Sequence, residues 1–100
     1  MQSKKNILKY SNPDKVFEKA KKYLGNDTRI QLSTKKNKKY MVYNPHKKKW
    51  IHFGMIPYQD FTKSNNRQQR KRYLIRSASI PGDWKKDKYS PNNLSRHILW

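Results

Sequence analysis

Clusters of lysine and arginine without acidic neighbours are the groups in this sequence best suited to bind a ligand. Of its 100 residues, 25 are Lys or Arg and only 6 are Asp or Glu, which gives a net charge of +19. Charge of one sign at this density opposes compaction of the chain, and a dense polyanion would relieve the repulsion. The composition therefore favours binding to nucleic acid, the commonest such polymer, over an ordinary soluble domain.

Two lysine clusters lie on either side of a short aromatic stretch, one in residues 34–39 and one in residues 46–49. No acidic residue occurs in residues 28–59, so nothing nearby in the sequence offsets their charge. A loop lysine binds phosphate well because its point charge needs no fixed orientation. We therefore expect phosphate contacts from Lys35, Lys36, Lys38, Lys39, Lys47, Lys48 and Lys49. The alternative is that these are solvated turns that only keep the protein soluble.

A third basic cluster lies in a predicted helix, residues 66–77, and has no acid three or four positions away. Its members are Arg67, Arg70, Lys71, Arg72 and Arg76. Like charges at these spacings oppose an isolated helix, so an anion held against the helix would stabilise it. Arginine also grips phosphate with two hydrogen bonds. We expect nucleic-acid contact above all from Arg72 and Arg76. For Arg67 and Arg70 the alternative is that their side chains pack over the sheet or pair with Asp60 or Asp83.

Aromatic side chains accompany the charge, and 13% of the residues are Phe, Trp or Tyr. A sheet face with aromatic rings and flanking cations could stack unpaired bases, and Tyr43 and Trp50 are the candidates for stacking. The alternative is that a small domain needs its aromatic residues for the core.

Patterns typical of catalysis are missing from the sequence. His46, His52 and His97 are isolated, the six acids are scattered, and no glycine-rich phosphate loop or cysteine is present. We expect a protein that is not an enzyme, with no catalytic residue, metal site or cofactor. No apolar run is long enough for a signal peptide or a membrane span, and we expect no membrane partner.

Helix signals are clearest near the N-terminus. Residues 1–11 are basic and polar, and we interpret them as a flexible arm. Asn12 can cap a helix, Pro13 suits its first position, and Gly25 can end it. Two further helices are predicted, over residues 66–77 with a cap at Ser64 or Asn65, and over residues 91–99.

Residues 29–33 alternate in polarity as a strand does, and residues 40–43 and 50–53 are two short apolar-aromatic runs. Turn residues separate them, which predicts a three-stranded antiparallel meander. A second loop at residues 45–48 would place Tyr43 opposite Trp50, and would put Tyr40, Val42, Ile51 and Phe53 on one face. The expected fold class is α+β: a single domain, residues 12–100, with an N-terminal helix, the meander and two C-terminal helices.

From residue 40 onward the sequence resembles a family of small basic proteins, largely uncharacterised, of giant nucleocytoplasmic large DNA viruses. The resemblance rests on YMVYNPHKKKWIHFG, YQDFTK and RKRYLIRSASIPGDWKKDKYSPNNLSRHILW, in that order. It implies a viral protein in the virion or the viral factory, and it brings no assigned binding residues. Residues 1–39 lie outside it.

These observations together predict a non-enzymatic, largely sequence-independent nucleic-acid-binding protein that packages or organises a viral genome, with double-stranded DNA preferred to RNA. One alternative is a minor structural protein of the virion shell that contacts acidic coat-protein surfaces. Another is single-stranded nucleic-acid binding through aromatic stacking.

Overall fold

An N-terminal helix, a three-stranded antiparallel sheet and C-terminal helices make up residues 7–100, the part of the chain that the computed structural model describes. The elements are α1 (Pro13–Leu24), β1 (Ile30–Leu32), β2 (Lys38–Asn44), β3 (Lys49–Met55), α2 (Phe61–Ser64), α3 (Arg67–Ala78) and α4 (Pro91–Leu94). Helix α4 continues into a π-helical segment, Ser95–Leu99, and 3₁₀ turns occupy Ile7–Lys9 and Trp84–Lys86. The predicted α+β fold class is confirmed.

Helix α1 begins and ends where the sequence predicts. The Asn12 side chain accepts a hydrogen bond from the backbone N–H of Lys15 at 3.3 Å, which satisfies one of the unpaired donors of the first turn. At the other end Gly25 has a φ of +112°, which a residue without a side chain adopts without strain. Val16 and Ala20 are fully buried, so this face of α1 packs into the core.

The sheet has the order β1-β2-β3, with both pairs antiparallel. Tyr43 pairs with Trp50, and this confirms the predicted register. Tyr40, Val42 and Phe53 are fully buried and form the inward face, as expected. Strands β2 and β3 are longer than predicted, because pairing extends to Lys38 and Met55 at the open end of the hairpin.

The C-terminal half differs from the prediction at its caps. Asp60 caps the short helix α2, which the sequence analysis missed, by accepting from the Thr62 backbone N–H at 3.0 Å. Helix α3 is capped by Asn66, which accepts from the Gln69 N–H at 3.1 Å, and not by Ser64 or Asn65. The last predicted helix, residues 91–99, is confirmed as α4 and its π-helical continuation.

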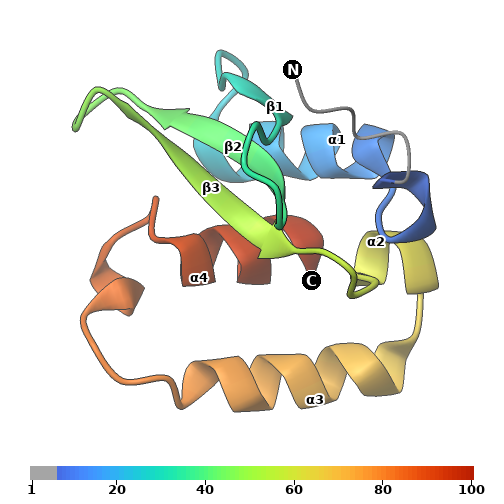
Figure 1. Ribbon diagram of the computed structural model, residues 1–100. Helices are drawn as coiled ribbons and strands as arrows, with labels where there is room; N and C mark the ends of the chain where they lie inside the picture. The colour runs from blue at the N-terminus through green and yellow to red at the C-terminus, as the bar shows by residue number, and fades with distance from the viewer. Residues whose placement is uncertain (1–6) are drawn as a thin grey trace.

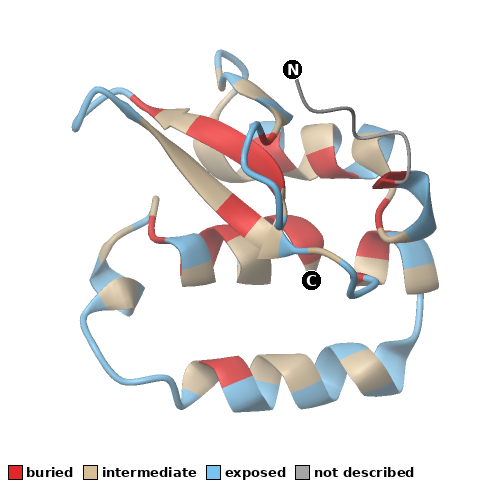
Figure 2. Ribbon diagram, in the orientation of Figure 1, coloured by how far each residue is buried: buried red, intermediate tan, exposed pale blue. Residues whose placement is uncertain are grey.

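The core lies between the sheet, α1 and the C-terminal helical segment, and the exposed residues concentrate in α3 and the loops (Figure 2). Residues 1–6 of the predicted arm lie outside the described residues. From Ile7 the chain packs on the domain, since Ile7 and Ser11 are both buried. Helix α3 forms an outer layer on the far side of α4 from the sheet (Figure 1).

Polar contacts hold α3 in that position. Arg96 Nη1 donates to the Leu74 carbonyl at 2.7 Å, and Asn92 Nδ2 donates to the Ser77 carbonyl at 3.2 Å. The rings of Tyr73 and Trp100 stack with centroids 4.4 Å apart. Because Ser77 is the one buried residue of α3, the helix depends on its cap and on these contacts more than on apolar packing.

Candidate nucleic-acid interface

Helix α3 carries five cationic side chains in an exposed position: Arg67, Arg70, Lys71, Arg72 and Arg76. Among the described residues, none of the five pairs with an Asp or Glu side chain. The acids that form ion pairs lie elsewhere, at Glu18, Asp60 and Asp87. Helix α3 therefore presents positive charge that the protein itself does not neutralise.

The five cations do not share one face of α3. Arg70 turns toward the protein, where its Nε donates to the backbone oxygen of Trp100 at 2.7 Å and its guanidinium lies 5.4 Å from the Phe61 ring centroid. Arg72 and Arg76 lie one turn apart on another side of the helix, and Arg76 borders a pocket. Arg70 thus has a structural role, and Arg72 and Arg76 are better placed to meet a ligand.

The β2–β3 turn presents the second lysine cluster. Asn44 shapes this turn, because its Oδ1 accepts from the backbone N–H groups of His46 and Lys47 at 3.0 and 3.3 Å. Lys47, Lys48 and Lys49 are exposed, and Lys47 Nζ lies 3.5 Å from Asp87 Oδ2. One of the three lysines is thus paired within the protein, which weakens this cluster as an anion site.

The β1–β2 connection contains the first lysine cluster, and its members differ in exposure. Lys35 and Lys36 are exposed and Lys38 is half-buried. Lys39 is only 2% exposed, so the prediction that it contacts nucleic acid is wrong for this fold. Its Nζ lies 3.1 Å from Asp60 Oδ2 and donates to the Tyr10 carbonyl at 3.3 Å.

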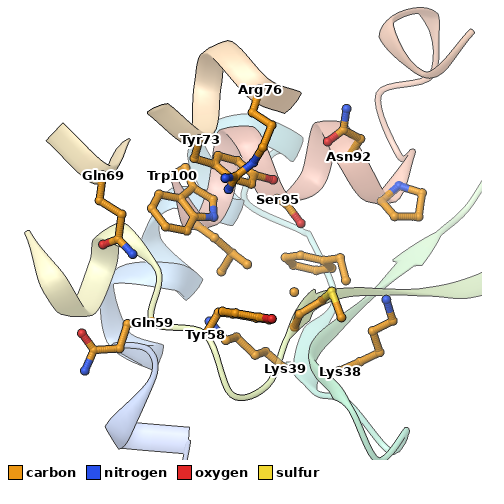
Figure 3. Close-up of a pocket in the computed structure, with 15 residues that line it drawn as sticks. Lys38, Lys39, Tyr58, Gln59, Gln69, Tyr73, Arg76, Asn92, Ser95 and Trp100 are labelled. Carbon is orange, nitrogen blue, oxygen red and sulfur yellow. The ribbon is translucent and has the colours of Figure 1, made fainter. Parts of the chain in front are cut away.

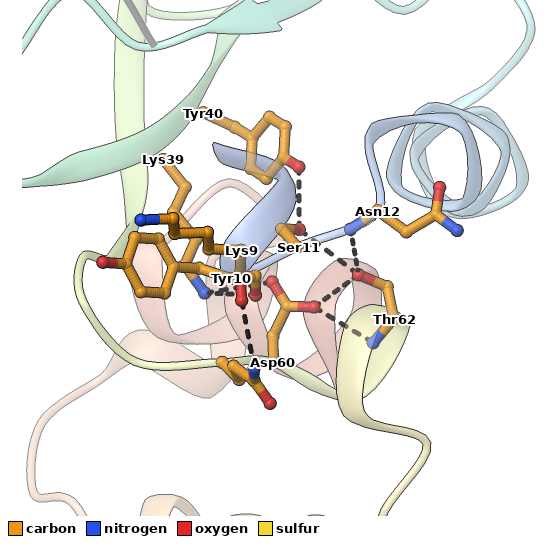
Figure 4. A network of polar contacts seen from close by, with 9 residues as sticks. Lys9, Tyr10, Ser11, Asn12, Lys39, Tyr40, Asp60 and Thr62 are labelled. Atoms are coloured by element: carbon orange, nitrogen blue, oxygen red, sulfur yellow. Dashed lines mark hydrogen bonds and ion pairs between the residues drawn. The ribbon is translucent and has the colours of Figure 1, made fainter. Parts of the chain in front are cut away.

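A buried polar network surrounds that ion pair (Figure 4). Asp60 Oδ1 accepts from the backbone N–H and, at very short range, from the hydroxyl of Thr62. The Tyr40 hydroxyl donates to Ser11 Oγ at 2.7 Å, and Ser11 Oγ lies 3.2 Å from Thr62 Oγ1. Burial lowers the pKa of the Lys39 ammonium, and the charge of Asp60 opposes that shift. The network joins the N-terminal turn, β2 and α2, and it gives Lys39 a structural function.

The two lysine loops lie at opposite ends of the sheet, because β2 joins them. A seven-residue strand spans about 20 Å, so the loops do not form one compact patch. Lys38 pairs with Met55 at the end of β3 and borders the same pocket as Arg76. Lys38 of β2 and Arg76 of α3 therefore border one pocket, and the Lys47–Lys49 turn lies at the other end of the sheet.

The aromatic candidates for stacking lie on the outer face of the sheet. Tyr43 and Trp50 contact each other with centroids 5.5 Å apart, and both are half-buried. The guanidinium of Arg29 lies 4.9 Å from the Tyr43 centroid and 5.4 Å from that of Trp50. Sequence reasoning missed this contact, which depends on β1 lying beside β2. A base that stacked here would have to displace Arg29.

Residues 7–100 contain neither a cluster of metal-ligating side chains nor a helix that could span a membrane. No group of three or more His, Cys, Asp or Glu side chains in this range could hold a metal ion. No helix in it is long and apolar enough to cross a membrane.

A family model matches residues 28–77, which run from the start of the sheet region to the buried Ser77 of α3. The chain belongs to DUF5754, a family of unknown function. The DUF5754 match overlaps the sequence resemblance over residues 40–77 and also includes residues 28–39. No curated protein and no solved structure matches the chain.

The DUF5754 region contains all twelve candidate cationic residues, together with Tyr43 and Trp50. It also contains Asp60 and thus both members of the buried ion pair. Helix α1 and the C-terminal helical segment, which complete the core, lie outside it.

Proposed function

We propose that this protein binds nucleic acid without enzymatic activity and largely without sequence preference, with double-stranded DNA as its main ligand. The observation that carries the proposal is the set of exposed α3 cations without an acidic partner among the described residues. Such cations neutralise backbone phosphates and release condensed counterions, a contact that does not depend on base sequence.

Duplex binding is favoured over single-strand stacking by the contacts of the sheet. The outer aromatic pair, Tyr43 and Trp50, already holds Arg29. The cations of α3 and of the loops are exposed, apart from Lys38, which is half-buried, and Lys39, which is buried. Given the resemblance to proteins of giant DNA viruses, we propose that the polymer is a viral genome, organised in the virion or the viral factory.

The salt dependence of affinity tests this function. For a duplex of about 30 base pairs, log K should fall linearly with log salt concentration, with a slope of about −0.9 per phosphate contacted. Fluorescence anisotropy on the purified chain measures it. An affinity unchanged at about 0.5 M salt would contradict phosphate binding.

Polyglutamate serves as a comparison that tests the shell-protein alternative, in which the charges contact acidic coat proteins. If the protein bound polyglutamate as tightly as DNA or more tightly, that alternative would be favoured.

A further inference from the structure

A pocket of about 420 Å³ lies between α3, the end of β3 and the C-terminal helical segment (Figure 3). Its floor includes the buried side chains of Phe53 and Leu99. Tyr58, Tyr73 and Trp100 add aromatic surface, and Tyr58 is 65% exposed at the mouth. A pocket of this size and lining has room for one small molecule with a flat apolar part.

The attachment of α3 and the glycine at position 54 shape the walls and floor of the pocket. Helix α3 is attached through polar contacts of Arg70, Asn92 and Arg96 and through the stack of Tyr73 on Trp100, and this stack forms one wall of the pocket. At the floor, Gly54 has a φ of +82°, and a Cβ there would lie 2.9 Å from Leu99 Cδ1. A larger residue at position 54 would push into the Leu99 side chain, and glycine permits the close approach of β3 to the C-terminal segment.

Charge at the pocket favours an anionic occupant. Arg76 enters from α3 and Lys38 from β2 (Figure 3), and no acidic residue lines the pocket within the described part of the chain. Lys39 also borders the pocket, but its charge is offset by Asp60.

Amide side chains add hydrogen-bonding groups of both kinds. Gln59, Gln69 and Asn92 line the pocket. Gln59 Nε2 donates to the Lys9 carbonyl and Asn92 Nδ2 donates to the Ser77 carbonyl, so Gln69 is the amide best placed to offer both a donor and an acceptor to a ligand. The Gln69 side chain makes no hydrogen bond to any other described residue. A fatty acid would leave the Gln69 amide without a hydrogen-bonding partner, and inorganic phosphate would leave the aromatic surface without a contact. A nucleobase that carries a phosphate uses all three features.

We propose that this pocket binds a single unpaired nucleotide, with the base against the aromatic surface near Tyr58 and the phosphate at Arg76. The proposal rests on the proposed function for the source of that nucleotide, a strand end or an extruded base of bound nucleic acid. Arg76 then belongs both to the surface that binds the phosphates of the nucleic acid and to the pocket. The bound duplex and the pocket that holds the unpaired nucleotide would therefore lie next to each other.

Titration of the full chain with adenosine monophosphate, followed by ¹H–¹⁵N NMR, tests the pocket directly. We expect shifts at the Trp100 indole N–H and the Gln69 amide, and weaker binding of adenosine alone and of phosphate alone. Tyr58→Ala should weaken nucleotide binding roughly tenfold, because the base would lose the aromatic ring on which it stacks. Ile75→Ala is the control, because Ile75 is 64% exposed on α3 and does not line the pocket, and it should leave nucleotide affinity unchanged.

A blunt duplex and the same duplex with a single-stranded overhang separate this proposal from the proposed function. We expect tighter binding of the overhang form, and loss of that preference in Tyr58→Ala. Duplex binding without an overhang preference or nucleotide shifts would overturn the pocket proposal and leave the proposed function intact. Nucleotide binding without any duplex binding would overturn the proposed function and support the pocket as a site for free nucleotides. Shifts with decanoate but not with the nucleotide would also overturn the pocket proposal.

Discussion

Asp60 is the acid on which the N-terminal half of the fold depends most. It pairs with Lys39 in a fully buried position, accepts two hydrogen bonds from Thr62 and begins α2. A buried ion pair contributes little net stability against a well-packed apolar pair, but the loss of one partner leaves an uncompensated charge. The sequence alone did not reveal this pair, because its members lie 21 positions apart and Lys39 resembles its exposed neighbours.

We predict that Lys39→Met lowers the free energy of unfolding by about 3 kcal/mol, since it leaves the Asp60 carboxylate buried without its cation. Lys22→Met is the matched control: it breaks the exposed pair with Glu18 and should cost less than about 1 kcal/mol. Urea unfolding followed by circular dichroism measures both. Equal costs for the two variants would show that the buried pair has no special role.

His97 should make stability depend on pH. Burial is the main cause that lowers the pKa of the imidazole from its usual value of 6.5, and the charges of Arg96, Lys88 and Lys19 lower it further. The imidazole stacks on the ring of Tyr23, with ring centroids 4.5 Å apart. The unfolded chain then binds the proton at a higher pH than the folded chain, so stability falls as pH drops below about 6.5. His97→Phe keeps a stacking ring without a titrating group, and should flatten this part of the profile. Thermal unfolding of both proteins between about pH 5 and pH 7 measures this dependence. If the unmodified chain and His97→Phe lost stability equally over this range, His97 would not be the group responsible.

At the scale of elements, local signals in the sequence were sufficient for some parts of the fold. Asn12, Pro13 and Gly25 predicted the bounds of α1, and the expected loop at residues 45–48 predicted the register of β2 and β3. Helix α2 was missed because it is one turn long and its cap also serves the buried pair. The pocket was missed because it depends on how α3 stands relative to the sheet, which no local pattern encodes.

Helix α3 should be the least stable long element of the free protein. Its Arg72–Arg76 and Arg67–Lys71 pairs place like charges four positions apart, and Ser77 is its one buried residue. We predict that its amides exchange with solvent faster than those of α1, and that duplex DNA slows them while α1 changes little. Hydrogen exchange by mass spectrometry measures both helices at once. Equal protection of the two helices by DNA would show that α3 is not the contact element.

At the scale of the molecule, positive charge surrounds the sheet and is not confined to one groove. The lysine turn after β2 and the loop before it lie at opposite ends of a strand, and α3 is a third basic element, whose Arg76 borders the same pocket as Lys38. The described residues span 36 × 33 × 24 Å, which corresponds to about ten base pairs of duplex along the longest dimension. Composition alone predicted the polyanionic partner, but only the fold shows that Lys39 is withdrawn from the surface and that Arg76 and Lys38 border one pocket.

The most direct test of the central claim compares salt slopes of duplex affinity for two variants with the same change in charge. Arg72→Ala/Arg76→Ala removes the proposed phosphate contacts on α3, and Lys15→Ala/Lys21→Ala removes two exposed lysines of α1. The account predicts that the slope of log K against log salt becomes shallower by about 1.8 in the α3 variant, about 0.9 for each phosphate lost, and stays close to that of the unmodified chain in the α1 variant. Equal slopes in the two variants would contradict the assignment of α3 as the phosphate-binding element.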